Sequence, residues 1–123
     1  MSKKKILLVD DHKIMRTMIR NMLGEANYEF LEAGNGKEGL DVLQKDKTIN
    51  LILCDYNMPE MDGAGFLDER NKLPDYAKVP FVMVTSARSE SLIDQCNKKG
   101  VSGWLTKPFK KESLAEMVSG ILK

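Results

Sequence analysis

The stretch that decides the fold is Leu51–Gly63, which reads LILCDYNMPEMDG. Its first four residues form an uninterrupted apolar run that stops at Asp55, which is typical of a strand buried on both faces. Pro59 and Gly63 then interrupt the chain before the next helix begins. The strand therefore delivers one carboxylate to its carboxyl-terminal tip, which is the edge of an open α/β sheet where ligands bind. We interpret Asp55 as the central functional residue.

The composition indicates one globular domain, which we expect to span residues 1–123. The formal net charge of +1 disfavours direct nucleic-acid binding through bulk charge. No apolar run approaches the roughly 20 residues that cross a bilayer, and the one after the basic start is too short for a signal peptide. Cys54 and Cys96 do not make a disulfide framework. We therefore expect a cytoplasmic monomer that does not insert into membranes.

Four more short strands are predicted along the chain, and helices with one apolar face separate them. The strands are expected at Lys5–Val9, Tyr28–Ala33, Phe81–Val84 and Ser102–Thr106. The helices are expected around Ile14–Met22, Gly39–Asp46, from Gly63 through Leu67, Ser89–Lys99 and Leu114–Ile121, with Asp11 near the first N-cap. This alternation predicts parallel βαβ units with right-handed crossovers. The expected fold is α/β, a doubly wound five-stranded parallel sheet with five helices.

Chemically active side chains follow four of the predicted strands: Asp10 and Asp11, Asp55, Thr85 and Lys107. Neighbouring parallel strands lie about 4.8 Å apart, so these residues can converge at one edge of the sheet. Two carboxylates about 4 Å apart repel by about 4 kcal/mol at an effective dielectric of 20. A hard divalent cation such as Mg²⁺ relieves this repulsion through oxygen ligands. An Asp beside a divalent metal and a Lys is equipped to attack phosphorus.

The crowding of acids also makes a prediction about stability. Either Asp10→Asn or Asp11→Asn is expected to stabilise the metal-free fold, because the repulsion is relieved, while weakening Mg²⁺ binding.

Taken together, these residues resemble the receiver domain of two-component response regulators over essentially the whole chain. The shared residues are Asp10-Asp11, Asp55 within DYNMPEMDG, Thr85, and Lys107-Pro108-Phe109. The resemblance implies a flavodoxin-like sheet with the strand order 2-1-3-4-5. The first helix and Ser102-Gly103-Trp104 are similar to the chemotaxis-type, CheY-like single-domain members of the family.

The resemblance implies a role for each residue of the predicted site. Asp55 is expected to accept a phosphoryl group from the phosphohistidine of a histidine kinase or from a small phosphodonor. Asp11, Asp55 and the backbone carbonyl of Asn57 are expected to hold Mg²⁺, with Asp10 acting mainly through water. Lys107 is expected to pair with the phosphoryl oxygens.

The resemblance also implies a conformational switch. Thr85 is expected to move and hydrogen-bond the phosphoryl group, and Trp104 stands where the family usually has Tyr or Phe. The face around Trp104 is then expected to bind a downstream target, with a flagellar motor switch protein as one candidate. A sensor histidine kinase or a phosphotransfer protein is the expected upstream partner. The Lys107–Pro108 peptide is expected to be cis, and Ala87 offers no polar side chain to steer a hydrolytic water.

Two other functions stay open from the sequence. An aspartate-nucleophile phosphatase typically has a second Asp two residues after the nucleophile, where this chain has Asn57. A binding module without phosphorylation is disfavoured by the intact Asp55, Thr85 and Lys107. We therefore expect a signalling receiver rather than an enzyme. His12, the only histidine, is interpreted as a solvated side chain because no second histidine can share a metal.

Overall fold

The computed structural model describes residues 3–86 and 89–122 of the chain. Strands and helices alternate through the described residues, as predicted. The strands are β1 (Lys4–Val9), β2 (Tyr28–Ala33), β3 (Leu51–Cys54), β4 (Phe81–Thr85) and β5 (Gly103–Thr106). The helices are α1 (Lys13–Leu23), α2 (Gly36–Lys45), α3 (Gly63–Asn71), α4 (Glu90–Lys98) and α5 (Lys111–Ile121). The strands pair in parallel in the order β2-β1-β3-β4-β5, which confirms the predicted fold class and strand order.

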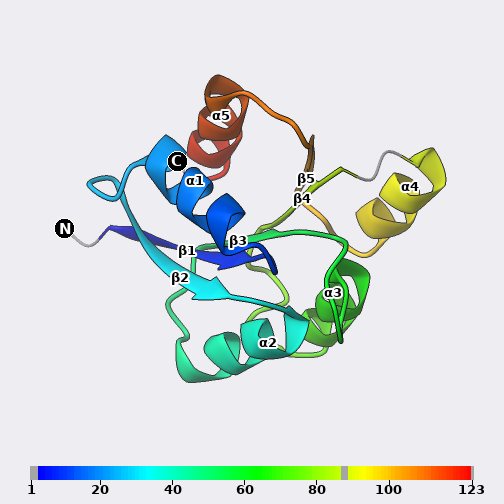
Figure 1. Ribbon diagram of the computed structural model, residues 1–123. Helices are drawn as coiled ribbons and strands as arrows, with labels where there is room; N and C mark the ends of the chain where they lie inside the picture. Colours follow the sequence, from blue (N-terminus) through cyan, green and yellow to red (C-terminus); the bar gives the residue numbers. More distant parts are fainter. Residues whose placement is uncertain (1–2, 87–88, 123) are drawn as a thin grey trace.

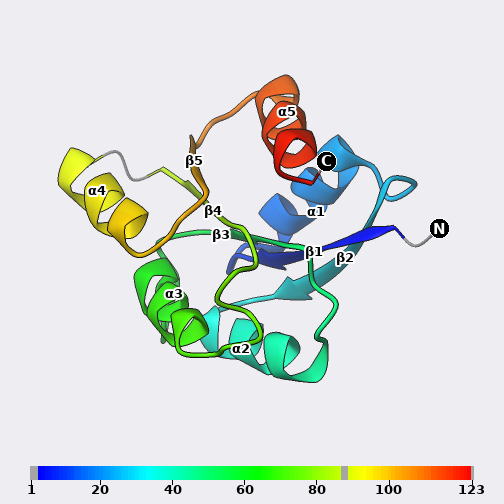
Figure 2. The same ribbon diagram turned by 180° about the vertical axis from the view of Figure 1, so that it is seen from behind.

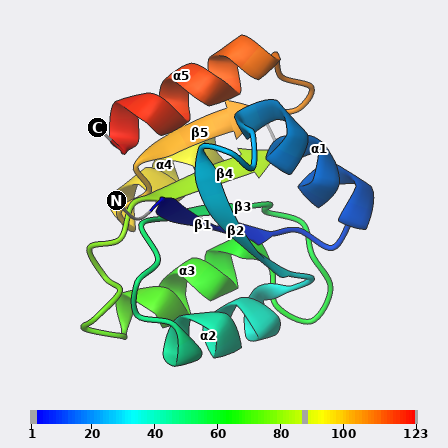
Figure 3. The ribbon, with the colours of Figure 1, turned by 90° about the vertical axis from the view of Figure 1, so that its left-hand side faces the viewer.

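The helices cover both faces of the sheet. Helices α1 and α5 lie side by side on one face, and α2 and α3 lie together on the other (Figure 1). The view from behind and the view along the sheet show the same layers, with α4 beyond β4 near the edge of the sheet (Figures 2 and 3). The crossover helices therefore leave the carboxyl-terminal edge of the strands open, which is where the predicted site residues lie.

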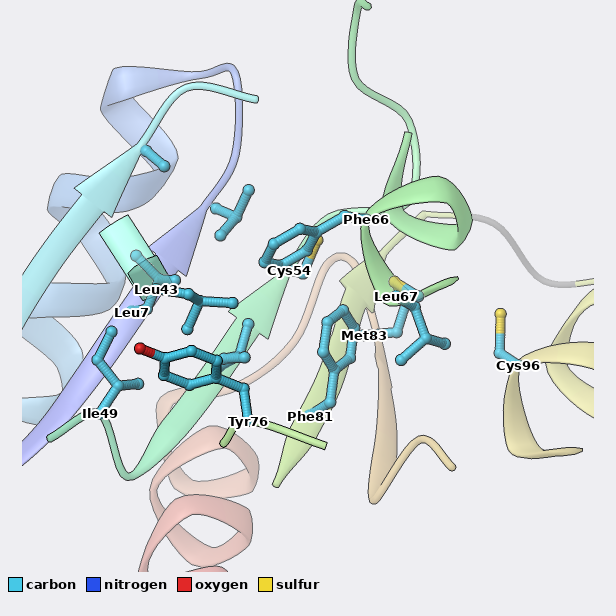
Figure 4. Packing of buried hydrophobic residues seen from close by; sticks show 13 residues of the cluster. Leu7, Leu43, Ile49, Cys54, Phe66, Leu67, Tyr76, Phe81, Met83 and Cys96 are labelled. Atoms are coloured by element: carbon cyan, nitrogen blue, oxygen red, sulfur yellow. The ribbon is translucent and has the colours of Figure 1, made fainter. Parts of the chain in front are cut away.

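Two apolar clusters hold these layers together. On the α2 and α3 side, Phe66 and Leu67 pack with Phe81 and Met83 of the sheet, and the cluster extends to Cys96 of α4 (Figure 4). On the opposite side, a second cluster joins α1 and α5 to the sheet, through Ile19, Leu23, Leu114 and Val118. The central strand β3 is buried along its whole length, as its continuous apolar run predicts. Burial of β3 fixes the position of Asp55, the next residue.

The helix starts differ in how their free N–H groups are satisfied. In α2, Asn35 accepts from the Glu38 backbone N–H, while the Glu38 side chain accepts from the Gly34 N–H, which is a reciprocal cap. Helix α5 has Lys110 as its N-cap, without a side-chain cap. Helix α1 has His12 as its N-cap, also without a side-chain cap.

Asp11 lies directly before His12, the N-cap of α1, as expected. The carboxylate that accepts from the His12 backbone N–H is that of Asp10, at 2.9 Å. Asp11 stays available for other contacts at the edge of the sheet.

Candidate functional site

Three carboxylates gather at the carboxyl-terminal edge of the sheet. Strands β1 and β3 pair with Val9 beside Cys54, so Asp10 and Asp55 leave neighbouring strands at the same level. Both are buried, at 4% and 6% exposure. Oxygen atoms of Asp10, Asp11 and Asp55 lie within 4.8 Å of one another. The predicted convergence of these acids is therefore present in the structure.

Lys107 supplies the counter-charge to the two buried acids. Its ammonium donates to Asp10 Oδ2 at 3.0 Å and to Asp55 Oδ2 at 3.2 Å. Burial alone lowers the pKa of Lys107, but the two carboxylates outweigh burial and raise it above its ordinary value. The Lys107–Pro108 peptide is cis, as expected. A single lysine therefore bridges two acids that repel each other.

His12 is the residue of this cluster that sequence reasoning missed. Its side chain is 69% exposed, which agrees with the interpretation as a solvated residue. Its Nδ1 nevertheless lies 3.2 Å from Asp10 Oδ1 and 3.1 Å from Asp11 Oδ1. The imidazole thus sits at the mouth of the acid cluster. The position of His12 directly after Asp10-Asp11 in the sequence was the available signal, because a residue next to two acids in the chain lies close to them in the fold.

The loop after β3 is held close to the central acid. The Asn57 backbone N–H donates to Asp55 Oδ1 at 3.4 Å, and the Gly63 N–H donates to the Tyr56 carbonyl at 2.7 Å. A Cβ atom on Gly63 would lie 2.6 Å from the Asp55 carbonyl oxygen, a distance that real Cβ atoms do not tolerate. Glycine at position 63 therefore permits the close approach of α3 to the Asp55 backbone.

The two predicted switch residues, Thr85 and Trp104, lie on β4 and β5. Thr85 ends β4 with its side chain fully buried, and its carbonyl accepts from the Lys107 backbone N–H at 2.9 Å. Trp104 is half-buried on β5 beside Met83 and packs against the α2 and α3 cluster. Its indole Nε1 is buried without a hydrogen-bond partner among the described residues. Ala87 lies outside the described residues.

A ladder of charged groups behind the site was also not predicted. The Arg16 side chain donates Nε to Glu32 Oε1 at 2.8 Å and Nη1 to the Asp10 carbonyl. Arg20 also binds Glu32, and it reaches Glu25 as well. Burial raises the pKa of Glu32, but the hydrogen bonds from the two arginines outweigh burial and lower it. The ladder joins α1 to β2 directly beneath the acids.

A hollow of about 430 Å³ opens beside Asp55. It is lined by acidic, polar and apolar side chains of His12, Ile14, Met15, Met18, Asp55, Asn57, Ser86 and Lys107. The apolar part comes from α1, where Ile14 and Met18 are 77% and 43% exposed. The hollow gives a molecule from solution access to the Asp55 carboxylate.

The donor chemistry of the cluster fits a hard divalent cation. Two of the three acids are buried, and one ligand atom each of Asp10, Asp11, His12 and Asp55 lies within 4.8 Å of the others. Oxygen ligands of this kind suit Mg²⁺, which needs few protein ligands because it keeps several waters. The side chains that could hold such an ion are Asp10, Asp11, His12 and Asp55.

Fold and site together define a class of protein: a doubly wound α/β domain with an acid and lysine cradle at the carboxyl-terminal edge of its sheet. A model of the response regulator receiver domain family matches residues 6–119. The "Chemotaxis protein CheY homolog" of Campylobacter jejuni is 33% identical over 119 residues, covering 96% of this chain and 92% of the relative. The chain belongs to the response regulator receiver domain family.

Solved structures agree with this assignment. The chemotaxis response regulator CheY4 of Vibrio cholerae superimposes with a TM-score of 0.89 at 32% identity, covering 98% of this chain and 99% of that one. The phosphorylated cyanobacterial phytochrome response regulator RcpA gives a TM-score of 0.83 at 27% identity, covering 98% and 91%. Within residues 3–86 and 89–122, no helix has the length and apolar character needed to span a bilayer.

Proposed function

We propose that Asp55 is a phospho-acceptor, and that Asp10, Asp11, Asp55 and Asn57 hold Mg²⁺ beside it. The observation that supports this most strongly is the contact of Lys107 with both Asp10 and Asp55 at the mouth of a hollow that is open to solution. An acid that is nearly buried, adjacent to a lysine and to further acids, has the surroundings of a nucleophile for phosphorus. We propose one receiver domain over residues 1–123, acting in the cytoplasm as a monomer.

The proposed chemistry assigns a task to each group. An Asp55 oxygen forms a bond to phosphorus, while the bond from phosphorus to the imidazole nitrogen of a phosphohistidine breaks and its electron pair stays on that nitrogen. Lys107 neutralises charge on the phosphoryl oxygens. Bound Mg²⁺ supplies further neutralisation of that charge. Asp10 and Asp11 orient the ion and keep it beside Asp55.

The proposed conformational change follows from the charge that phosphorylation adds. A phosphoryl group brings about −1.5 to −2 charges to the site, and Lys107 is already in place to contact it. Thr85 is proposed to rearrange toward the phosphoryl group, since its hydroxyl is buried at the end of the neighbouring strand. The conformation of the face around Trp104 then depends on phosphorylation, because the residues that contact the phosphoryl group stabilise one of two arrangements of that face.

Partners of two kinds are proposed. A sensor histidine kinase or phosphotransfer protein approaches over the hollow, where the apolar Ile14 and Met18 offer contact area. A downstream target binds the face around Trp104. The relative from Campylobacter jejuni and the Vibrio cholerae structure are both named chemotaxis proteins, which supports a flagellar motor switch as the target to test first.

The test is phosphoryl labelling by a small donor. The protein is incubated with radiolabelled acetyl phosphate and MgCl₂, and incorporation is measured for wild type, Asp55→Ala and Asp41→Ala. Asp41 is an exposed acid on α2, so its variant controls for the loss of one carboxylate. We expect labelling of wild type and Asp41→Ala that requires Mg²⁺, and none of Asp55→Ala. Equal labelling of all three would remove Asp55 as the acceptor, and steady turnover of phosphorylated metabolites would favour a phosphatase instead.

A further inference from the structure

The backbone of Asp10 is fixed from several sides. Its N–H donates to the Ala33 carbonyl at 3.1 Å, at the end of β2. Its carbonyl accepts from Arg16 Nη1, and its side chain accepts from the His12 N–H. The peptide unit that carries this carbonyl joins Asp10 to Asp11. Its orientation therefore sets the direction in which both acidic side chains leave the chain.

Arg16 binds the carbonyl group of the peptide between Asp10 and Asp11. Helix α1 begins only at Lys13, so the Asp10 carbonyl precedes the helix and lies outside its backbone ladder. The guanidinium reaches this carbonyl while its Nε stays on Glu32, the residue that precedes Ala33. Two contacts thus hold Asp10 to the end of β2: one directly through Ala33, and one through the pair of Arg16 and Glu32.

We propose that Arg16 is a positioning residue for the Mg²⁺ site, acting through the peptide between Asp10 and Asp11. The inference rests on the metal site of the proposed function and deepens it. The side chain of Arg16 is 16% exposed, so its fork is held in place by packing as well as by Glu32. Only a planar fork with several donors reaches a carboxylate and a carbonyl at once.

The direction of the change in Mg²⁺ affinity distinguishes a positioning role of Arg16 from an effect of its charge alone. Arg16 is a cation near a site for a cation, so removing its charge alone should strengthen Mg²⁺ binding. Removing its hold on the Asp10 carbonyl should weaken binding, because residues that orient metal ligands are typically worth about 10-fold to 100-fold in affinity. A weaker affinity in the neutral variant can therefore not arise from through-space electrostatics.

Arg20 provides a matched control within the same ladder. It also lies on α1 and also binds Glu32, but its other contacts are Glu25 and the ring of Phe30, and not the Asp10 carbonyl. Arg16→Met and Arg20→Met thus remove the same charge, the same kind of side chain and one contact to Glu32. They differ in the remaining contacts. Arg16→Met also removes the donor to the Asp10 carbonyl, whereas Arg20→Met removes the contact to Glu25.

The experiment is a Mg²⁺ titration of the full chain followed by NMR, using the backbone amides of Asp55 and Asn57. Wild type, Arg16→Met, Arg16→Lys and Arg20→Met are compared after circular dichroism has confirmed that each is folded at the working temperature. We expect the dissociation constant to rise about tenfold in Arg16→Met and to stay within about twofold of wild type in Arg20→Met. Arg16→Lys should fall between, because one ammonium satisfies the carbonyl or Glu32 but not both.

A second measurement separates positioning from a general loss of structure. The rate of labelling by acetyl phosphate is measured against Mg²⁺ concentration for each variant. In Arg16→Met we expect the Mg²⁺ concentration for half-maximal rate to rise, while the rate at saturating Mg²⁺ stays within about twofold of wild type. Equal affinities in Arg16→Met and Arg20→Met, or tighter binding in both, would overturn the proposal. If wild type binds no Mg²⁺, the metal site of the proposed function fails instead.

Discussion

Neutralising Asp11 should stabilise the metal-free protein, whereas neutralising Asp10 should not. The sequence assigns the same sign to both changes because it shows only that three acids are crowded together. The structure separates them. Asp10 is 6% exposed in its side chain and is paired with Lys107, while Asp11 is 29% exposed and its neighbour is the imidazole of His12. Among the described residues, Asp11 is therefore the one acid of the three whose repulsion is not offset by a lysine or arginine against its carboxylate.

The magnitude follows from the spacing of the carboxylate oxygens. At 4.8 Å, one pair of like charges repels by about 0.9 kcal/mol in water and about 3.5 kcal/mol at an effective dielectric of 20. Asp11 is partly exposed, so the lower figure applies more closely, and Asp11→Asn should add about 1 kcal/mol to the free energy of unfolding. For a chain of 123 residues this corresponds to a rise in Tm of about 3–5 °C. Asp10→Asn instead loses the ionic contact to Lys107 and should lower stability by about 1–3 kcal/mol.

The assay is thermal unfolding by circular dichroism, with a chelator and then with saturating MgCl₂. Asp41→Asn serves as a control for the change in net charge, because Asp41 is exposed on α2. Wild type should gain more Tm from Mg²⁺ than Asp11→Asn does, since the ion relieves the same repulsion that the variant lacks. The reasoning is refuted if Asp11→Asn has an unchanged or lower Tm in chelator, or if Asp10→Asn gains as much as Asp11→Asn.

Two further predictions concern the surroundings of the site, and a third concerns the opposite edge of the sheet, where Lys5 of β1 contacts Asp46. Gly63→Ala should destabilise the fold by about 1–3 kcal/mol and weaken Mg²⁺ binding, because its Cβ would meet the Asp55 carbonyl at 2.6 Å; denaturant unfolding and an ion titration measure both effects. Ile14→Asp should slow phosphoryl transfer from a histidine kinase several-fold and leave labelling by acetyl phosphate unchanged, and comparison of the two donors tests this. The hydrogen bond from Lys5 lowers the pKa of Asp46 from 3.8 to about 2, so its stabilising contribution is present above pH 4 and is lost as pH falls toward 2. Asp46→Asn should therefore flatten the loss of stability over that interval, as measured by urea unfolding at each pH.

Much of the architecture was predictable because it depends on local patterns. The apolar run before Asp55 is buried on both faces, and a run of that kind has few alternatives to a central strand. Once parallel strands alternate with helices, their carboxyl-terminal ends must share one edge. The meeting of Asp10, Asp55 and Lys107 follows from that geometry, although 97 residues separate Asp10 from Lys107 along the chain.

The rest depends on side-chain directions and on which elements pack together. The periodicity of α1 identifies its buried face, but it does not place Arg16 opposite Glu32 on β2, because that pairing needs the angle and register between helix and strand. The turn of the His12 ring toward the acids likewise depends on where α1 begins. The sequence places Asp11 near the N-cap, and the structure adds that the Asp10 carboxylate accepts from the backbone N–H of His12, two residues further along the chain.

The buried indole N–H of Trp104 affects the free energy of the switch that we propose at this residue. A donor shut away from water without a partner typically costs about 1–3 kcal/mol. Packing of the ring against its neighbours must exceed that penalty, and only the remainder favours the half-buried position of the ring. Turning the ring outward would rehydrate the nitrogen, which would offset part of the packing that the ring gives up. The penalty therefore narrows the free-energy difference between the two ring positions, and in the switch that we propose the contacts at the ends of β4 and β5 need only exceed that difference.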